Sequence, residues 1–358
     1  MVGKDDVHSL ADLKNAADPI VEIQALRSER KKLRAEMRRM QKEYGNLQTY
    51  FTDLKEAVEG LVIPPQIPQF KPGKSKKVTH PCTAVLHLTD WHYGAVQEAE
   101  EVEFANAFSP EILEARITNL VFDFLKWVEV QRNGYHIPNL TVIVTGDLIS
   151  GDIHRELQVT NAFPTPVQAT KVGFFLGQVL CMLSPHFEAV QVEFAVPDNH
   201  ARLTKKPQAK QQGLNTHNYV TGFVTDLVVK EQENITFSMH IAHTKAVTVC
   251  NRQYLITHGH GVMGWAGFPY YGIERKVAKE ALARLHEPEY NRFHKVIMGH
   301  WHAPLWHPWY WIGGSASGTD AYDHKQGRRS PPIQTAWLIH PEKNEFNRME
   351  FDLHEEEE

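Results

Sequence analysis

The sequence predicts an α/β layered domain preceded by a long coiled-coil helix. Between residues 20 and 62, apolar residues recur at alternating spacings of three and four, which is the heptad pattern of a coiled coil. From Val78 onward, short runs rich in β-branched residues alternate with longer helical patterns. This alternation indicates helices packed on a largely buried sheet. The chain has 358 residues, 42% of them hydrophobic, and can therefore bury a full core.

Charge and composition exclude several classes of protein. The formal net charge is −5, so any nucleic-acid contact would need local positive patches. Cys82, Cys181 and Cys250 are widely spaced among apolar neighbours, which favours buried, reduced thiols over a disulfide framework. The N-terminus lacks an apolar signal core, and the run "VGFFLGQVLCML" from Val172 is too short to span a bilayer. We therefore expect a cytoplasmic protein with no membrane segment.

The N-terminal heptads predict self-association. Their seam consists of Ile23, Leu26, Leu33, Met37, Met40, Tyr44, Leu47, Phe51, Leu54, Val58 and Leu61. With Ile23 at position a, a parallel pair of helices would set Glu22 opposite Arg27 and Glu29 opposite Arg34 across chains. Arg30 at an a position favours a dimer, while the aromatic a residues leave higher states open. The alternative is one amphipathic helix packed on its own domain.

Composition also sets the domain boundaries. The helix must end where "IPPQIPQFKPGKSKK" begins, because its four prolines and its glycine cannot continue a helix. We expect a tail over 1–19, a coiled-coil oligomerisation helix over 20–62, a Pro/Lys linker over 63–77, the main domain over 78–354 and an acidic tail over 355–358.

The main domain contains recognisable strands and helices. The strands are predicted at "TAVLHLT" before Asp90, "LTVIVTG" before Asp147, "VQVEFAV" before Asp198, "QYLIT" before His258 and "KVIM" before Gly299. Helices are predicted at "SPEILEARITNLVFDFLKWVEVQ", with Ser109 as cap and Pro110 in the first turn, and at "PVQATKVGFFLGQVLCML".

Polar side chains follow each predicted strand. They are Asp90 and His92; Asp147, Asp152 and His154; Asn199 and His200; His258 and His260; and His300 and His302. Because the carboxyl ends of strands in α/β sheets converge on one crevice, we expect these residues to meet. Carboxylates, imidazoles and an amide without cysteine suit manganese, iron or zinc better than calcium or magnesium alone. Two ions sharing one carboxylate, roughly 3.5 to 4 Å apart, are expected, with manganese preferred and magnesium an alternative.

The ordered series D-x-H, G-D, N-H, H-G-H and G-H-x-H, from Ala84 to Pro304, resembles the calcineurin-like metallophosphoesterase superfamily. The resemblance implies a sandwich of two mixed β-sheets flanked by helices. It also implies that one ion is held by Asp90, His92 and His302, the other by Asn199, His258 and His300, and that Asp147 bridges both. Such enzymes hydrolyse phosphate monoesters or diesters through a metal-bridging hydroxide. The resemblance makes Asp147 and His200 catalytic, with His200 donating a proton to the leaving group.

The chain departs from the usual Gly-Asn-His-acid motif, because Asp198 and Ala201 occupy the glycine and acidic positions. How His200 is oriented is therefore open: Asp198 would take over the carboxylate's role, or His200 would only contact phosphate.

Three further residues are candidates for substrate binding. His260 either contacts substrate phosphate or fills its turn. His154, with Asp152, either lines the crevice or begins a helix. Arg202 opens a run with Lys205, Lys206 and Lys210, which either binds phosphate or is a solvated face.

Several motifs bear on the substrate. "DWHYG" resembles the opening motif of the nuclease subunits of double-strand-break repair complexes, which favours a nuclease acting on DNA. Tryptophans at 265, 301, 306, 309 and 311 would stack unpaired bases or pack as an edge strand. Against a nuclease, we do not expect the extra DNA-binding region of those subunits, because only about fifty residues follow His302 and the last of them are acidic. In addition, the coiled coil of those complexes belongs to a separate ATPase.

The segment from "GGSASGTDAY" to "RRSPPIQTAWLIHP" resembles metallophosphoesterases of bacteriophages and prophages, which would place the protein in a host cytoplasm. The leading hypothesis is a DNA-directed phosphodiesterase. The alternatives are a hydrolase of small nucleotides or phosphomonoesters, and a non-catalytic oligomeric module that retains the fold.

Overall fold

The computed structural model describes residues 31, 81–262, 269–342 and 344–354. The chain separates into two compact units, Met1–Gly60 and Leu61–Glu358, and the fold below is that of the second. Apart from Lys31, the predicted N-terminal tail, coiled coil, linker and acidic tail lie outside the described residues, so these assignments stay predictions.

The larger sheet has six strands in the order β11-β10-β1-β2-β3-β4. Their bounds are β1 Pro81–Leu88, β2 His136–Val144, β3 Ala189–Ala195, β4 Ile235–His240, β10 Ile333–Ile339 and β11 Glu345–Asp352. Strands β1 to β4 run parallel, while β10 pairs antiparallel with both β1 and β11. The sheet is therefore mixed, and the C-terminal ends of β1, β2 and β3 lie at one edge.

The smaller sheet has five strands in the order β5-β6-β7-β9-β8. Their bounds are β5 Lys245–Val249, β6 Arg252–Ile256, β7 Lys295–Met298, β8 Leu305–Trp306 and β9 Tyr310–Ile312. Strands β6, β7 and β9 are parallel, and β5 and β8 are antiparallel edge strands. The predicted strands are confirmed as β1, β2, β3, β6 and β7.

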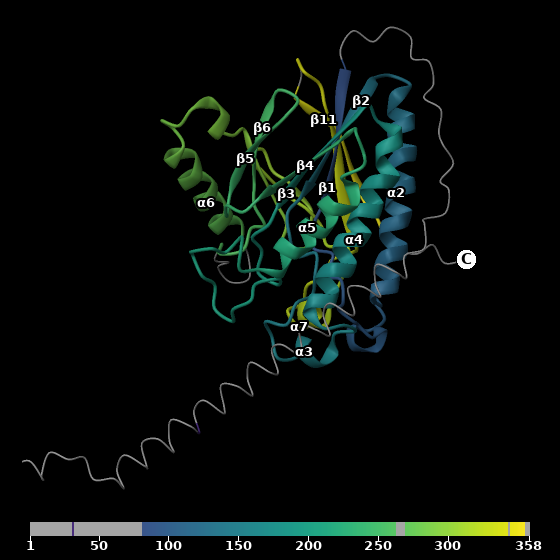
Figure 1. The fold of residues 1–358 in the computed structure, drawn as a ribbon, viewed down its shortest axis with the longest axis vertical. Coiled ribbons are helices and arrows are strands. Elements are labelled where there is room, and N and C mark those ends of the chain that lie inside the picture. The colour runs from purple at the N-terminus through teal and green to yellow at the C-terminus, as the bar shows by residue number, and fades with distance from the viewer. Residues whose placement is uncertain (1–30, 32–80, 263–268, 343, 355–358) are drawn as a thin grey trace, which may run out of the picture. The chain divides into compact units, whose positions relative to one another are not determined.

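Helices cover the outer faces of the two sheets. Their bounds are α2 Pro110–Arg132, α3 Leu157–Thr160, α4 Thr165–Leu183, α5 His217–Val229, α6 Tyr270–Ala283 and α7 Ala321–Lys325, with 3₁₀ turns at η1 Ala99–Val102, η2 Ser184–His186 and η3 Glu289–Asn291. Figure 1 places α2, α4 and α5 on one side of the strands and α6 on the other. The predicted sandwich of two mixed sheets flanked by helices is confirmed.

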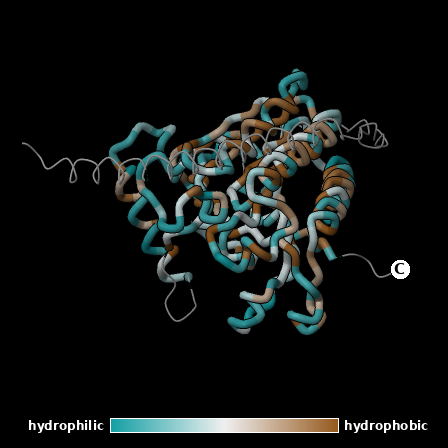
Figure 2. Tube along the Cα trace, turned by 60° about the horizontal axis from the view of Figure 1, so that its bottom comes forward, coloured by the Kyte–Doolittle hydropathy of each residue, from teal (hydrophilic) through white to brown (hydrophobic). Residues whose placement is uncertain are grey.

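Side-chain alternation along the strands separates the core into layers. In β1, Ala84 and Leu86 face the cluster that contains the α2 and α4 side chains, whereas Val85 faces the cluster between the sheets, as the period of two requires. A third cluster joins Ile273 of α6 to the outer face of the smaller sheet. Figure 2 shows hydrophobic stretches along the helices and many hydrophilic residues in the loops.

The two predicted helices form as α2 and α4. Ser109 caps α2 by accepting a hydrogen bond from the Ile112 amide, and Pro110 lies in its first turn, as predicted. The apolar run from Val172 belongs to a longer helical segment than expected, Thr165–His186, which is long and apolar enough to cross a membrane by length and composition alone. In this fold 61% of its most apolar stretch of 18 residues is buried, and the helix packs against α2, α5 and the sheet, as in a core helix.

The aromatic run after β7 mainly builds the core. Trp311 of β9 packs edge-to-face on Trp306 of β8 and on Trp337 of β10, with ring centroids 4.8 and 4.9 Å away. This favours the edge-strand interpretation for these tryptophans, while Trp309 is exposed. Cys82 is buried, as expected, but Cys250 is exposed in the β5–β6 turn, so the prediction of a buried thiol is wrong there.

Candidate metal centre

Most of the polar residues predicted at strand ends meet at one place between the two sheets, whereas Asp152 and His154 are exposed. Those from the larger sheet follow β1, β2 and β3, and those from the smaller sheet follow β6 and β7. The sheets approach closely here: the His300 amide donates to both carboxylate oxygens of Asp90, and His258 Nδ1 lies 2.8 Å from the Thr145 carbonyl oxygen. The carboxyl ends of the parallel strands of both sheets therefore lie next to one another.

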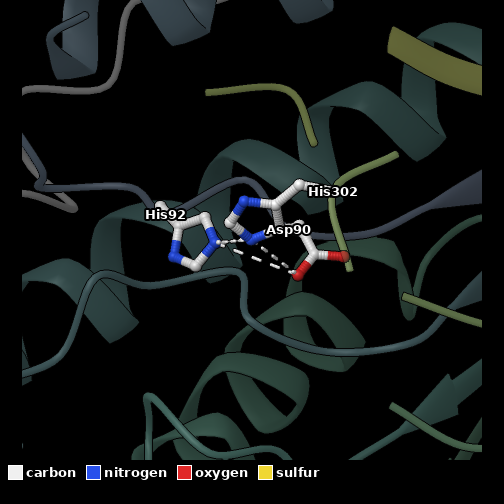
Figure 3. Close-up of side chains that lie close together, drawn as sticks. All are labelled: Asp90, His92 and His302. Atoms are coloured by element: carbon white, nitrogen blue, oxygen red, sulfur yellow. Dashed lines mark hydrogen bonds and ion pairs between the residues drawn. The ribbon is translucent and has the colours of Figure 1, made fainter. Parts of the chain in front are cut away.

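A first cluster consists of Asp90, His92 and His302 (Figure 3). His92 Nε2 lies 3.1 Å from His302 Nε2, and Asp90 Oδ1 lies 3.5 Å from His302 Nε2 and 3.9 Å from His92 Nε2. Asp90 is fully buried. Three potential ligand atoms thus face one point from two loops that lie far apart in the sequence.

A second cluster consists of Asp147, His258 and His300, joined by Asn199. His258 Nε2 lies 2.9 Å from Asp147 Oδ2 and 2.8 Å from Asn199 Oδ1. Asp147 also forms a third group with His92 and His200, whose ligand atoms lie within 4.8 Å of one another. Asp147 therefore lies between the two clusters, where a shared ligand would be required.

The orientation of the imidazoles fits cation binding. His258 Nδ1 faces the Thr145 carbonyl and His302 Nδ1 faces the Asp323 carboxylate. Both partners only accept hydrogen bonds, so each Nδ1 donates. In the neutral tautomer Nε2 then carries a lone pair aimed at the oxygens of Asp147 and Asn199 or of Asp90. Lone pairs that face one another need a proton or a metal ion between them, and this donor set therefore fits divalent cations.

Electrostatics agrees with a site short of positive charge. Burial opposes ionisation of Asp90, but hydrogen bonding to His302 and the charges of His258 and His302 lower its pKa to about 2. Burial likewise opposes protonation of His258, yet Asp147 raises the pKa of His258 to about 9. Burial, followed by neighbouring histidines, lowers the pKa values of His92 and His300 to about 3. Protons on His258 thus compete with any bound metal.

The backbone at the centre is strained. Five non-glycine residues have positive φ, namely Asp90, His92, Asp147, His300 and His302, at 47° to 72°. Such conformations cost energy and persist where surrounding structure enforces them, often at functional sites. Gly299 allows the close approach of the sheets, because a Cβ there would lie 2.0 Å from Thr89 Oγ1 and 2.2 Å from Asp90 Oδ2.

His200 is oriented by backbone rather than by a carboxylate. Its Nδ1 donates to the Ser150 carbonyl at 2.6 Å, and its Nε2 lies 4.0 Å from Asp147 Oδ2. The His200 amide also donates to Asp147 Oδ1 at 3.0 Å. The Ser150 carbonyl thus orients the His200 ring, and the acidic residue that Ala201 replaces is not needed for this purpose. Ala201 itself is buried.

Asp198 supports the loops instead of the His200 ring. Its Oδ2 accepts from the Asp147 amide at 3.0 Å and its Oδ1 accepts from the Ala201 amide at 2.9 Å. Burial, followed by the charge of Asp147, raises the pKa of Asp198 to about 7. Asp198 therefore links the loops after β2 and β3.

The candidate substrate residues are placed differently from one another. The His154 ring is exposed and lies 6.5 Å from the His200 ring. It lies in the turn that leads into α3: its carbonyl accepts from the Gln158 amide at 3.4 Å, and the helix begins at Leu157. His260 Nε2 accepts a hydrogen bond from the side-chain Nε2 of Gln212 at 2.5 Å.

Arg202 is committed to its own loop. Its guanidinium donates to the carbonyls of Asn199, Thr204 and Lys205. The expected role in substrate binding therefore has no support from the orientation of this side chain.

Asp323 of α7 is a residue that sequence reasoning missed. Its Oδ2 accepts from His302 Nδ1 at 3.2 Å, and its Oδ1 forms an ion pair with Arg328 at 3.0 Å. The carbonyls of Thr145 and Ser150 were missed as well. Carbonyl contacts leave no mark in the residue pattern, whereas an acidic residue four positions after "SASGT" was a detectable though weak signal.

No protein-family model and no curated protein matches the chain. Among solved structures, wild-type Vps29 complexed with Zn²⁺ from Entamoeba histolytica is 12% identical over 76% of this chain and 99% of that chain, with a TM-score of 0.31. A novel archaeal phosphodiesterase is 11% identical over 75% of this chain and 99% of that chain, with a TM-score of 0.33. Vps29 from Cryptosporidium parvum is 12% identical over 76% of this chain and 98% of that chain, with a TM-score of 0.32. Likenesses this weak decide neither activity nor substrate.

Proposed function

We propose that this chain is a dinuclear-metal phosphodiesterase that acts on nucleic acid, with DNA as the preferred substrate. One observation carries the catalytic part of the proposal: Asp147 belongs both to the group with His258 and His300 and to the group with His92 and His200. A carboxylate shared between two imidazole clusters is the arrangement that a two-metal hydrolase needs.

Each ion has its own set of ligands in this proposal. Asp90, His92 and His302 would hold one ion, Asn199, His258 and His300 the other, and Asp147 both. When bound, two cations supply the charge that activates water and neutralises phosphate oxygens. The ligands are nitrogen and oxygen atoms without sulfur, which suits borderline divalent ions. Manganese is the ion that we propose first, with iron, zinc or magnesium as alternatives.

His200 would act as the proton donor to the leaving oxygen. The Ser150 carbonyl holds Nδ1, so Nε2 is the free ring nitrogen, and it faces the centre 4.0 Å from Asp147 Oδ2. About one fifth of the His200 side chain is exposed, against 1% for Asp147. A substrate can therefore reach His200 without displacing the buried ligands, and general-acid catalysis requires such access.

The preference for DNA rests on the resemblance of "DWHYG" to nuclease motifs. In this proposal the protein works in the cytoplasm, which would be that of the host cell if a phage encodes the protein. It forms a homo-oligomer through its N-terminal heptads, with a dimer favoured. Hydrolysis of small nucleotides or phosphomonoesters is the competing activity.

The test is metal analysis of the purified full-length protein together with a substrate panel. We expect about two equivalents of metal per chain and manganese-dependent hydrolysis of bis(p-nitrophenyl) phosphate, exceeding that of the monoester. Single-stranded DNA, duplex DNA and cyclic nucleotides then separate polymer from small-molecule activity, because only polymers bring steep salt dependence. Metal-loaded protein that cleaves neither the diester nor the monoester would refute the catalytic proposal.

A further inference from the structure

The loop after β3 concentrates positive charge next to the candidate centre. Residues 199–225 include Arg202, Lys205, Lys206 and Lys210 but no acidic residue, although the whole chain has a net charge of −5. We call residues 201–217 the basic loop. Its lysines are exposed, so their charge faces solvent.

The basic loop is a built structure. Arg202 pairs with Thr216 in an antiparallel bridge, and the His217 amide donates to the Ala201 carbonyl at 2.8 Å. The Arg202 guanidinium then donates to three carbonyls, including that of Lys205 at 3.1 Å. The Arg202 guanidinium therefore holds the loop together through its hydrogen bonds. The cations of the basic loop that remain available to a ligand are its lysines.

Contacts at both ends attach the basic loop to the centre. At its start, Arg202 Nη1 donates to the carbonyl of Asn199 at 3.0 Å, one of the proposed ligands. Near its end, the side-chain amide Nε2 of Gln212 donates to His260 Nε2, and the His260 ring lies 5.6 Å from that of His258. The loop thus spans the side of the site formed by Asn199 and His258.

Some cations elsewhere on the surface are paired with acidic residues, and among the described residues the lysines of the basic loop are not. Elsewhere, Lys276 pairs with Glu280 at 3.1 Å and Arg329 pairs with Glu103 at 2.9 Å. Lys205, Lys206 and Lys210 form no ion pair with any residue that the structure describes. Unpaired cations beside a phosphate-cleaving site indicate an anionic ligand that extends beyond the reacting phosphate.

We propose that Lys205, Lys206 and Lys210 bind the phosphate backbone of a nucleic-acid strand whose scissile phosphate lies at the metal centre. This inference rests on the proposed function and names its substrate class: a polymer with phosphates on both sides of the cleaved bond. Lysine contacts to phosphates position a strand without reading its bases. The loop therefore provides affinity and placement, and the ligands carry out the chemistry.

The test compares salt dependence of binding. The probe is a fluorescently labelled 20-nucleotide oligothymidylate with phosphorothioate linkages, which resists hydrolysis, and the protein is the full-length chain with manganese. The variant combines Lys205→Ala, Lys206→Ala and Lys210→Ala. The slope of log K against log salt is negative, and each lost phosphate contact makes it shallower by about 0.7 for single strands. We expect a slope about 2 units shallower, so that between 50 and 200 mM salt the wild type loses roughly 16-fold more affinity than the variant.

Two matched triple variants serve as controls. Replacing Lys126, Lys230 and Lys279 by alanine removes equal charge from exposed positions on other elements and should leave the wild-type slope. Replacing Lys205, Lys206 and Lys210 by arginine keeps the charge and should also keep the slope. If the loop-alanine variant changes the slope by no more than the distant control does, the inference is overturned. Hydrolysis of bis(p-nitrophenyl) phosphate by the wild type is read separately, and its failure would instead refute the proposed function.

Discussion

His302 donates from Nδ1 to the carboxylate of Asp323, 3.2 Å away, and Arg328 pairs with the other oxygen of that carboxylate at 3.0 Å. His302 follows β7, while Asp323 lies on the short helix α7. Burial opposes protonation of His302, but Asp323 and Asp90 raise the pKa of His302 well above its usual range. The carboxylate thus determines which nitrogen of His302 faces Asp90 and His92.

We expect Asp323→Asn to weaken metal binding at the first cluster by roughly 10- to 100-fold, the usual effect of losing such a support. An amide orients the imidazole less firmly and adds no negative charge. Metal titration of the apoprotein measures the change, with the exposed Asp226→Asn as control. Unchanged metal affinity and unchanged activity in Asp323→Asn would contradict a positioning role.

Asp147→Asn should remove most activity, by roughly 10³-fold or more, because it weakens the shared ligand of both ions. Metal content per chain should fall in parallel. Hydrolysis of bis(p-nitrophenyl) phosphate and elemental analysis measure the two effects, and the exposed Asp123→Asn on α2 is the control. A variant that keeps both ions and full activity would show that Asp147 does not bridge.

Asp198→Asn should destabilise the fold by about 1–3 kcal/mol. The carboxylate accepts from two buried amides, those of Asp147 and Ala201. An asparagine offers only one acceptor oxygen, so one amide would face an NH₂ group and lose its partner. Urea unfolding measures the difference against Asp226→Asn. Wild-type stability in Asp198→Asn would mean that the loops rearrange to satisfy both amides.

His87 should make stability depend on pH. Burial, only partly offset by the charge of Asp90, lowers the pKa of His87 to about 4, against about 6.5 in the unfolded chain. Between these values the unfolded state binds the extra proton, so stability falls as the pH drops from about 6.5 to about 4. The difference corresponds to about 3 kcal/mol.

His87→Gln keeps a hydrogen-bonding group next to Thr145, which lies 2.8 Å from His87 in the wild type, but removes the titration. Urea unfolding at several pH values should give a shallower pH dependence in this window, while the exposed His136→Gln should match the wild type. Equal pH dependence in all three proteins would contradict the prediction.

Deleting residues 1–62 should reduce the mass in solution from an oligomer to a monomer, because the heptad seam lies in that segment. Light scattering during gel filtration measures it. Hydrolysis of a small diester should change little, since the candidate ligands all lie after residue 80. An unchanged mass would remove the coiled-coil proposal.

Much of the fold followed from local patterns. The strands before Asp90, Asp147, Asp198, His258 and Gly299 are long enough, and apolar enough, to be recognised. Strands β4, β5, β10 and β11 were not predicted. In β4, the residues of "ITFSMH" have mixed polarity, are mostly only partly buried and carry little periodic signal. Strand β10 is buried along its whole length, and a short buried strand has no alternation by which to recognise it.

By itself, the sequence determined the α/β class and the set of polar residues that would meet, because parallel strands bring their carboxyl ends to a common edge whatever their separation along the chain. Only the tertiary structure decided how those residues are oriented. Ser150 and Thr145 act through backbone carbonyls, Asp323 reaches His302 from another element, and Arg202 turns to its own loop. Such contacts depend on through-space distances of a few ångströms between distant segments, and local composition carries no record of them.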